Sequence, residues 1–169
     1  MAIDLRDITD AVQTYLNKKV TVAITDLSPA DGNSVNPGES FDVHIAATNA
    51  DATSGGVALK NLKYRLSVDN GSVAKLVVPD GMFFHTTDLD GNDVTKGSER
   101  TSMIVQNTLF TKLPIGENST LVVAGKATDA ASGGSTSVRA RVLADVDLDE
   151  LFPPGEDTPV ATKSLTVVG

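Results

Sequence analysis

The chain has 169 residues, a formal net charge of −8 and no cysteine. An acidic chain lacks the clustered Lys and Arg that a phosphate backbone requires, so no nucleic-acid partner is expected. Without cysteine the chain forms neither disulfides nor thiolate metal sites. Its length suits one ordinary domain, and no apolar run approaches the roughly 18–20 residues that span a bilayer, so no membrane span is expected.

Residues 4–17 depart from the β-type pattern of the rest of the chain and are expected to form a short helix. Apolar residues recur there at helical spacing, and they are Leu5, Ile8, Val12, Tyr15 and Leu16. A helix of about three to four turns is marginal alone in water, so this stripe must lie either on its own domain or on a neighbouring subunit. The stripe is the predicted interaction surface. The predicted domain organisation is an N-terminal helical segment, residues 1–19, followed by a β domain, residues 20–169.

The clearest strand follows a turn at Pro37-Gly38. Proline presets the second position of the turn, and Gly38 tolerates the positive φ that a type II turn requires at its third position. Along the strand, apolar side chains alternate with polar ones such as Asp42 and His44, as in a half-buried antiparallel strand. One core between two sheets is expected, and its predicted members are Phe41, Val43, Ile45, Tyr64, Leu66 and Leu121.

Other strands are expected where runs of period two lie between turns that contain Gly or Pro. These runs cover residues 20–24, 57–69, 73–78, 103–110, 120–128, 138–144 and 165–168. Asn70-Gly71 is the strongest two-residue hairpin signal, so 73–78 should pair back on 57–69, and 129–135 should form another hairpin-like loop. Strands at this spacing, without helices between them, predict a mainly β fold built as an antiparallel sandwich.

Two segments of the chain share a pattern. In residues 35–49 a Pro-Gly-Glu-Ser turn leads into an alternating strand that ends at Asn49, and in 113–124 a Leu-Pro-x-Gly-Glu turn leads into another strand. This arrangement resembles bacterial immunoglobulin-like modules of the CARDB and conserved-repeat type. The resemblance implies an immunoglobulin-like antiparallel β-sandwich of about seven to nine strands, in proteins of surfaces and assemblies, and it implies no enzyme. Residues 82–107, which begin with the most aromatic stretch of the chain, have no counterpart in it.

An acidic loop at residues 88–93 has the oxygen density of a calcium site, with candidate ligands at Asp88, Asp90 and Asp93. The loop does not fit the EF-hand register, because Gly91 comes too early. A second acidic set at 145–150 could converge on the same ion. Both sets are also typical of turns and exposed strand ends, so calcium stays open as a cofactor and no other cofactor is expected.

No residue set commits the chain to a chemistry. Its histidines, His44 and His85, come without a Gly-x-Ser-x-Gly elbow, and Gly125-Lys126 lacks the flanking residues of a phosphate-binding loop, so no catalysis is expected. Alternating cations on an exposed strand favour solubility and edge protection more than binding. This basic stripe consists of Lys60, Lys63, Arg65 and Lys75.

These observations favour a non-enzymatic structural protein of an assembly such as a phage virion or a related extracellular particle. Met1 runs directly into the predicted helix without an export signal, which suggests synthesis in the cytoplasm and release within a particle. Its partners would be proteins, either further copies of the chain or another particle protein. The alternative is a ligand-binding or adhesion module of a bacterial surface protein, which would bind carbohydrate or protein.

Overall fold

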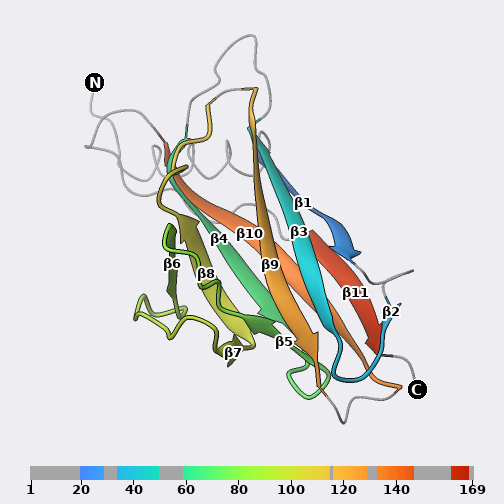
Figure 1. Cartoon of the computed structure of the whole chain (residues 1–169). Helices are drawn as coiled ribbons and strands as arrows, with labels where there is room; N and C mark the ends of the chain where they lie inside the picture. The colour runs from blue at the N-terminus through green and yellow to red at the C-terminus, as the bar shows by residue number, and fades with distance from the viewer. Residues whose placement is uncertain are drawn as a thin grey trace, which may run out of the picture.

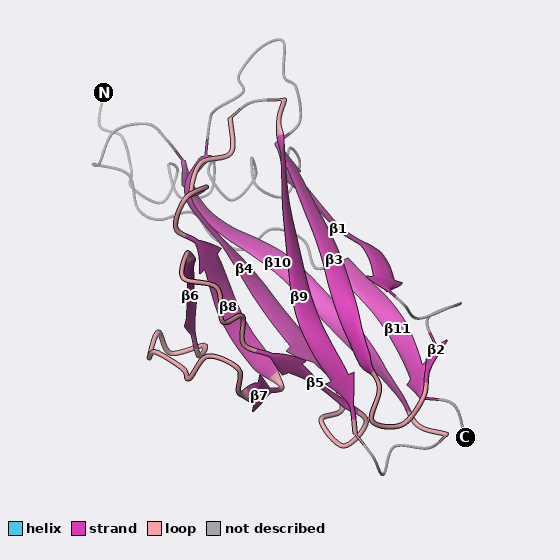
Figure 2. Ribbon diagram, viewed as in Figure 1, coloured by secondary structure: helices cyan, strands magenta, loops and turns pink. Residues whose placement is uncertain are grey.

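The computed structural model describes residues 20–28, 34–49, 59–114, 116–128, 133–146 and 161–167. Within these ranges eleven strands form two sheets that enclose one core (Figures 1 and 2). No helix capable of crossing a membrane occurs in the described part of the chain. The predicted helix over 4–17 lies outside it, so the helix, the boundary at residue 19 and the interaction stripe stay predictions. That stripe is Leu5, Ile8, Val12, Tyr15 and Leu16.

The two sheets are antiparallel apart from one short parallel pair. The five-stranded sheet has the order β1 (Val20–Ser28), β3 (Ser40–Asn49), β9 (Asn118–Ala127), β5 (Ala74–Val77) and β7 (Glu99–Arg100). The six-stranded sheet has the order β2 (Ser34–Val35), β11 (Ala161–Val167), β10 (Ser135–Val146), β4 (Leu59–Val68), β8 (Ser102–Asn107) and β6 (Phe84–Thr87). Only β2 and β11 pair in parallel among these strands.

The strand order is that of an immunoglobulin-like sandwich. The run β1-β3-β9-β5 corresponds to strands A, B, E and D, and the run β11-β10-β4 corresponds to G, F and C. Between β5 and β9 the chain adds β6, β7 and β8, which widen both sheets. Residues 82–107, which have no counterpart in the family resemblance, are therefore an insertion between strands D and E. The prediction of a mainly β, immunoglobulin-like sandwich is confirmed.

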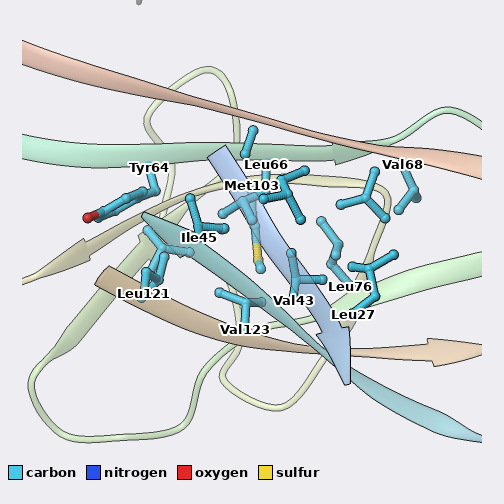
Figure 3. Packing of buried hydrophobic residues seen from close by; sticks show 14 of the residues in the cluster. Leu27, Val43, Ile45, Tyr64, Leu66, Val68, Leu76, Met103, Leu121 and Val123 are labelled. Atoms are coloured by element: carbon cyan, nitrogen blue, oxygen red, sulfur yellow. The ribbon is translucent and has the colours of Figure 1, made fainter. Parts of the chain in front are cut away.

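The core lies between the inner faces of the two sheets. Buried and more exposed side chains alternate along β3, β4 and β9, as the period of two predicts. The predicted core residues all belong to one buried cluster, most of them visible in Figure 3. They are Phe41, Val43, Ile45, Tyr64, Leu66 and Leu121.

Phe41 packs over a glycine on the neighbouring strand. Gly125 is its register partner on β9, and a Cβ built on Gly125 would lie 2.6 Å from Cε2 of the Phe41 ring. Any side chain at that position would displace the ring. Gly125, to which the sequence pattern assigns no role, thus provides the space that the Phe41 ring fills.

The predicted hairpin at Asn70-Gly71 is wrong, because β4 and β5 belong to different sheets. A type I′ turn needs positive φ at both central residues, and neither Asn70 nor Gly71 has it. The Asn70 carbonyl instead accepts hydrogen bonds from the N–H groups of Val73 (3.1 Å) and Ala74 (3.3 Å), and its Oδ1 accepts one from Ser72 (3.0 Å). This turn carries the chain across the sandwich. Residues 129–135 likewise join β9 and β10 of different sheets, so the second hairpin is also wrong.

The two segments that carry the family resemblance meet at Asn49. Both turns have a glycine with positive φ, at Gly38 (75°) and Gly116 (78°). Asn49, at the end of β3, is fully buried, and its Nδ2 donates to the Leu113 carbonyl oxygen at 3.1 Å. Its carbonyl accepts a hydrogen bond from the Gly116 N–H at 2.8 Å. The turn after Leu113 is therefore fixed to the end of β3.

Candidate functional site

The acidic loop after β6 is organised around Asp88. The Asp88 carboxylate accepts hydrogen bonds from the backbone N–H groups of Asn92 and Asp90, each at 2.9 Å, and from the Asn92 side-chain amide at 3.3 Å. These bonds hold the pKa of Asp88 below its ordinary value, and the bond from the Asn92 backbone N–H contributes most. The carboxylate thus already serves as an acceptor within the loop.

The other acidic candidates are placed elsewhere. Asp93 pairs with Nε2 of His85 at 2.7 Å, and both side chains are exposed. Glu99 is the twelfth residue counted from Asp88, the position of the bidentate ligand in an EF-hand, but it lies on β7 in the other sheet. In the part of the chain that the structure describes, no three His, Cys, Asp or Glu side chains are arranged to hold a metal ion. Residues 147–150 of the second acidic set lie outside that part.

Calcium at millimolar concentration is expected to leave the melting temperature unchanged relative to EDTA, because the Asp88 oxygens are already satisfied within the loop. Thermal melts of the chain in the two buffers measure this. An upward shift of several degrees that Asp90→Ala abolishes would instead establish a calcium site.

The predicted basic stripe is split between the sheets. Lys63 and Arg65 lie on β4, but Lys75 lies on β5 in the other sheet. The register instead places Arg65 opposite Arg141 of β10, and a shallow recess of about 230 Å³ opens there. Its lining residues are Arg65, Ser67, Arg139, Ala140 and Arg141.

One arginine of this recess is held by a carboxylate. Arg139 donates from Nε to Asp69 Oδ1 at 2.8 Å and from Nη2 to Oδ2 at 3.0 Å. This hydrogen-bonded pair lowers the pKa of Asp69 and raises that of Arg139. Both side chains are partly exposed, so the pair orders the surface and contributes little to stability.

A second surface, which the sequence did not assign, is apolar. Four of the six exposed large hydrophobic residues in the described ranges gather at one end of the β6–β8 ribbon. We call this group the apolar tip, and its residues with their exposed fractions are Met82 (81%), Phe83 (45%), Leu109 (57%) and Phe110 (67%). Exposed apolar residues that gather on neighbouring segments of a folded domain make a candidate contact surface.

Hydrogen bonds hold the two halves of the apolar tip together. The Phe83 carbonyl oxygen accepts from both the N–H (2.8 Å) and the hydroxyl (2.9 Å) of Thr108. After β8 the Asn107 side chain accepts from the Leu109 N–H at 3.0 Å, and its carbonyl accepts from the Phe110 N–H at 3.1 Å. With the Phe84 N–H bonded to the Gly81 carbonyl oxygen at 3.2 Å, the backbone of the tip forms two hydrogen-bonded turns.

A polar recess of about 350 Å³ adjoins the apolar tip and shares Phe110 with it. We call it the end recess. β8 ends and β9 begins at this end of the sandwich, the upper end in Figure 1. The residues that line it are Tyr64, Asn107, Phe110, Lys112, Glu117, Asn118, Ser119 and Thr120.

Sequence reasoning missed this end of the molecule for a local reason. The pattern predicts one strand over 103–110, which would alternate Leu109 and Phe110 between the two faces of a sheet. The strand ends at Asn107, whose side chain closes a turn. An Asn at a strand end is the signal that could have indicated this turn.

Comparisons with known proteins concern the fold. The chain matches no protein-family model, and no curated protein matches it in sequence. AvmM, which catalyzes macrocyclization in alchivemycin A biosynthesis, is 13% identical with a TM-score of 0.51, over 90% of each chain. The seventh ScaB type I cohesin from Pseudobacteroides cellulosolvens is 12% identical with a TM-score of 0.48, over 89% of this chain and 94% of that one. A Nocardia farcinica protein with an immunoglobulin-like fold is 14% identical with a TM-score of 0.44, over 89% and 98%.

At such identities the similarity to AvmM extends to the fold and to nothing finer. The strand order itself identifies the immunoglobulin-like sandwich, whereas the narrower CARDB-type resemblance stays a prediction. The chain therefore has the architecture of an immunoglobulin-like sandwich, and its fold is similar to that of AvmM.

Proposed function

We propose that this chain is a non-enzymatic protein-interaction module whose apolar tip docks on a folded protein partner. The single observation that carries the proposal is the gathering of Met82, Phe83, Leu109 and Phe110 on two hydrogen-bonded turns. Phe and Met are enriched at the centres of protein interfaces, and rigid aromatic side chains bind with a low entropy cost. An exposed group of this kind has a free energy to gain from burial.

The proposal that the module is not an enzyme has support from its histidines. His85 and Asp93 form an exposed pair, and His44 lies on β3, where its carbonyl oxygen accepts a hydrogen bond from the Thr25 hydroxyl at 3.3 Å. Neither imidazole ring is bonded to a Ser or Thr hydroxyl that it could activate, as far as the described ranges show. A binding role is thus the simpler proposal.

A double substitution in the apolar tip tests the docking role. Met82→Ser with Leu109→Ser removes apolar surface at two exposed positions and leaves the core and the end recess unchanged. We expect the wild-type chain, produced in its native host, to sediment with a larger assembly and the variant to sediment alone. The melting temperatures of the two purified proteins should agree within a degree or two, since exposed substitutions change stability little.

The matched control replaces exposed apolar residues outside the tip. Leu89→Ser with Val122→Ser removes residues of 44% and 48% exposure and should leave sedimentation unchanged. Loss of assembly in the control as well would show that general surface hydrophobicity, not the tip, is responsible. Recovery of the wild-type chain as a lone monomer would contradict the proposal.

The setting of this contact is part of the proposal. The preferred setting is a virion or a related extracellular particle, in which the predicted helix stripe would supply a second contact. The alternative is a module of a bacterial surface protein. Fractionation of the native host separates them, because the first places the chain in sedimenting particles and the second places it in the cell envelope.

A further inference from the structure

A hydrogen bond in the wall of the end recess joins the two sheets. Tyr64 of β4 packs its ring in the core, and Figure 3 shows its hydroxyl pointing out of the apolar cluster. That hydroxyl donates to Ser119 Oγ of β9 at 2.6 Å. Burial raises the pKa of Tyr64 above its ordinary value of 10.0, so the hydroxyl stays protonated at physiological pH. One wall of the recess is thus a fixed pair of hydroxyl groups.

The polar groups around this pair are of mixed character. Asn107 and the Ser119 hydroxyl each offer a donor and an acceptor, and the charged residues that line the recess are one cation, Lys112, and one anion, Glu117. The recess therefore has no net charge. A phosphorylated or strongly acidic ligand would gain little there, and an apolar ligand would leave the remaining donors and acceptors of these groups unpaired.

The remaining wall is aromatic. Phe110 is 67% exposed and lines the recess, so it offers apolar surface beside the hydroxyl and amide groups. A ligand that carries several hydroxyl groups and also an apolar face of C–H groups satisfies both walls. The volume of about 350 Å³ falls within the range of small-molecule sites.

From this combination we propose that the end recess binds a neutral carbohydrate, with a sugar ring packed on Phe110 and hydroxyl groups hydrogen-bonded to Tyr64, Ser119 and Asn107. This site goes beyond the proposed protein contact, and Phe110 is the one tip residue that it shares. Met82, Phe83 and Leu109 of the apolar tip do not line the recess. Either proposal can therefore fail without the other.

Titration followed by NMR tests the site. Neutral trisaccharides of glucose, N-acetylglucosamine and xylose are added at millimolar concentration to the ¹⁵N-labelled full chain. At least one is expected to shift amide signals of residues 107–120 in a saturable way. Phe110→Ala should weaken that binding about tenfold by removing the stacking wall. Tyr64→Phe should weaken it several-fold, and it keeps the ring that fills the core.

The controls separate the recess from the tip and from misfolding. Leu109→Ser lies in the tip alone and should bind the sugar as the wild type does. Ser119→Ala is a second, milder recess variant, for use if Tyr64→Phe alters the fold. Absence of saturable shifts with all three sugars, or binding that Phe110→Ala and Tyr64→Phe both leave unchanged, would overturn the proposal.

Discussion

Phe41→Ala is expected to lower the free energy of unfolding by about 3–5 kcal/mol, the usual cost of truncating a buried phenylalanine. The ring is almost wholly buried and packs directly over Gly125, so its loss leaves a cavity against a bare stretch of backbone. Urea denaturation measures the change. The neighbouring substitution Asp42→Ala, on the exposed face of the same strand, should alter stability by less than about 0.5 kcal/mol.

The glycine partner makes this prediction sharper. Gly125→Ala alone should destabilise the protein by about 1–3 kcal/mol, because its Cβ would collide with the ring. In the Phe41→Ala background the same substitution should cost much less, since the space is then empty. The two changes should therefore be strongly non-additive in a double-mutant cycle. Additive effects would mean that ring and glycine do not share one space.

Asn49→Asp is expected to cost about 3–5 kcal/mol at neutral pH, because it places a carboxylate in a fully buried position. The native Nδ2 donates to the Leu113 carbonyl oxygen, which an ionised carboxylate would face as a second acceptor. Asn49→Ala should cost less, about 1–3 kcal/mol, because the Leu113 oxygen keeps its hydrogen bond from the Leu59 N–H.

The pH dependence distinguishes the two variants. Burial disfavours the charged form, so the pKa of the carboxyl group that Asn49→Asp introduces is raised in the folded state. Its penalty is small below the unfolded pKa of about 3.9 and grows as the pH rises above that value. Denaturation at several pH values should show this trend for Asn49→Asp and not for Asn49→Ala. A parallel pH profile for both variants would mean that residue 49 is hydrated.

The sequence correctly predicted features that are determined within a single strand or turn. The alternation around Phe41, Val43 and Ile45 identified the face that β3 buries, because burial on one face of a sheet imposes a period of two. The turns at Gly38 and Gly116 were readable because each requires positive φ at a defined position. Strand type, inner face and turn chemistry are all local properties.

Pairing between strands is not local, and there the prediction failed. Asn70-Gly71 has the composition of a tight hairpin, yet β4 pairs with β8 and β10 and not with β5. The same limitation applies to the candidate site. The stretch that begins at Met82-Phe83 was recognised as aromatic. Its position beside Leu109-Phe110 depends on the pairing of β6 with β8, which the local sequence pattern does not predict.

The central place of β9 has a consequence for how the chain must fold. β9 lies between β3 and β5 in the sheet. One edge of β3 therefore lacks its hydrogen-bonding partner until β9, much later in the chain, has been synthesised. Sandwiches with such long-range pairing fold on the millisecond to second timescale, because loop closure precedes the contacts that reward it. During translation the unpaired side of β3 is open meanwhile, and it can pair with the strand of another nascent chain. Correct folding therefore requires that β9 pair with β3 before β3 pairs with a strand of another incomplete copy.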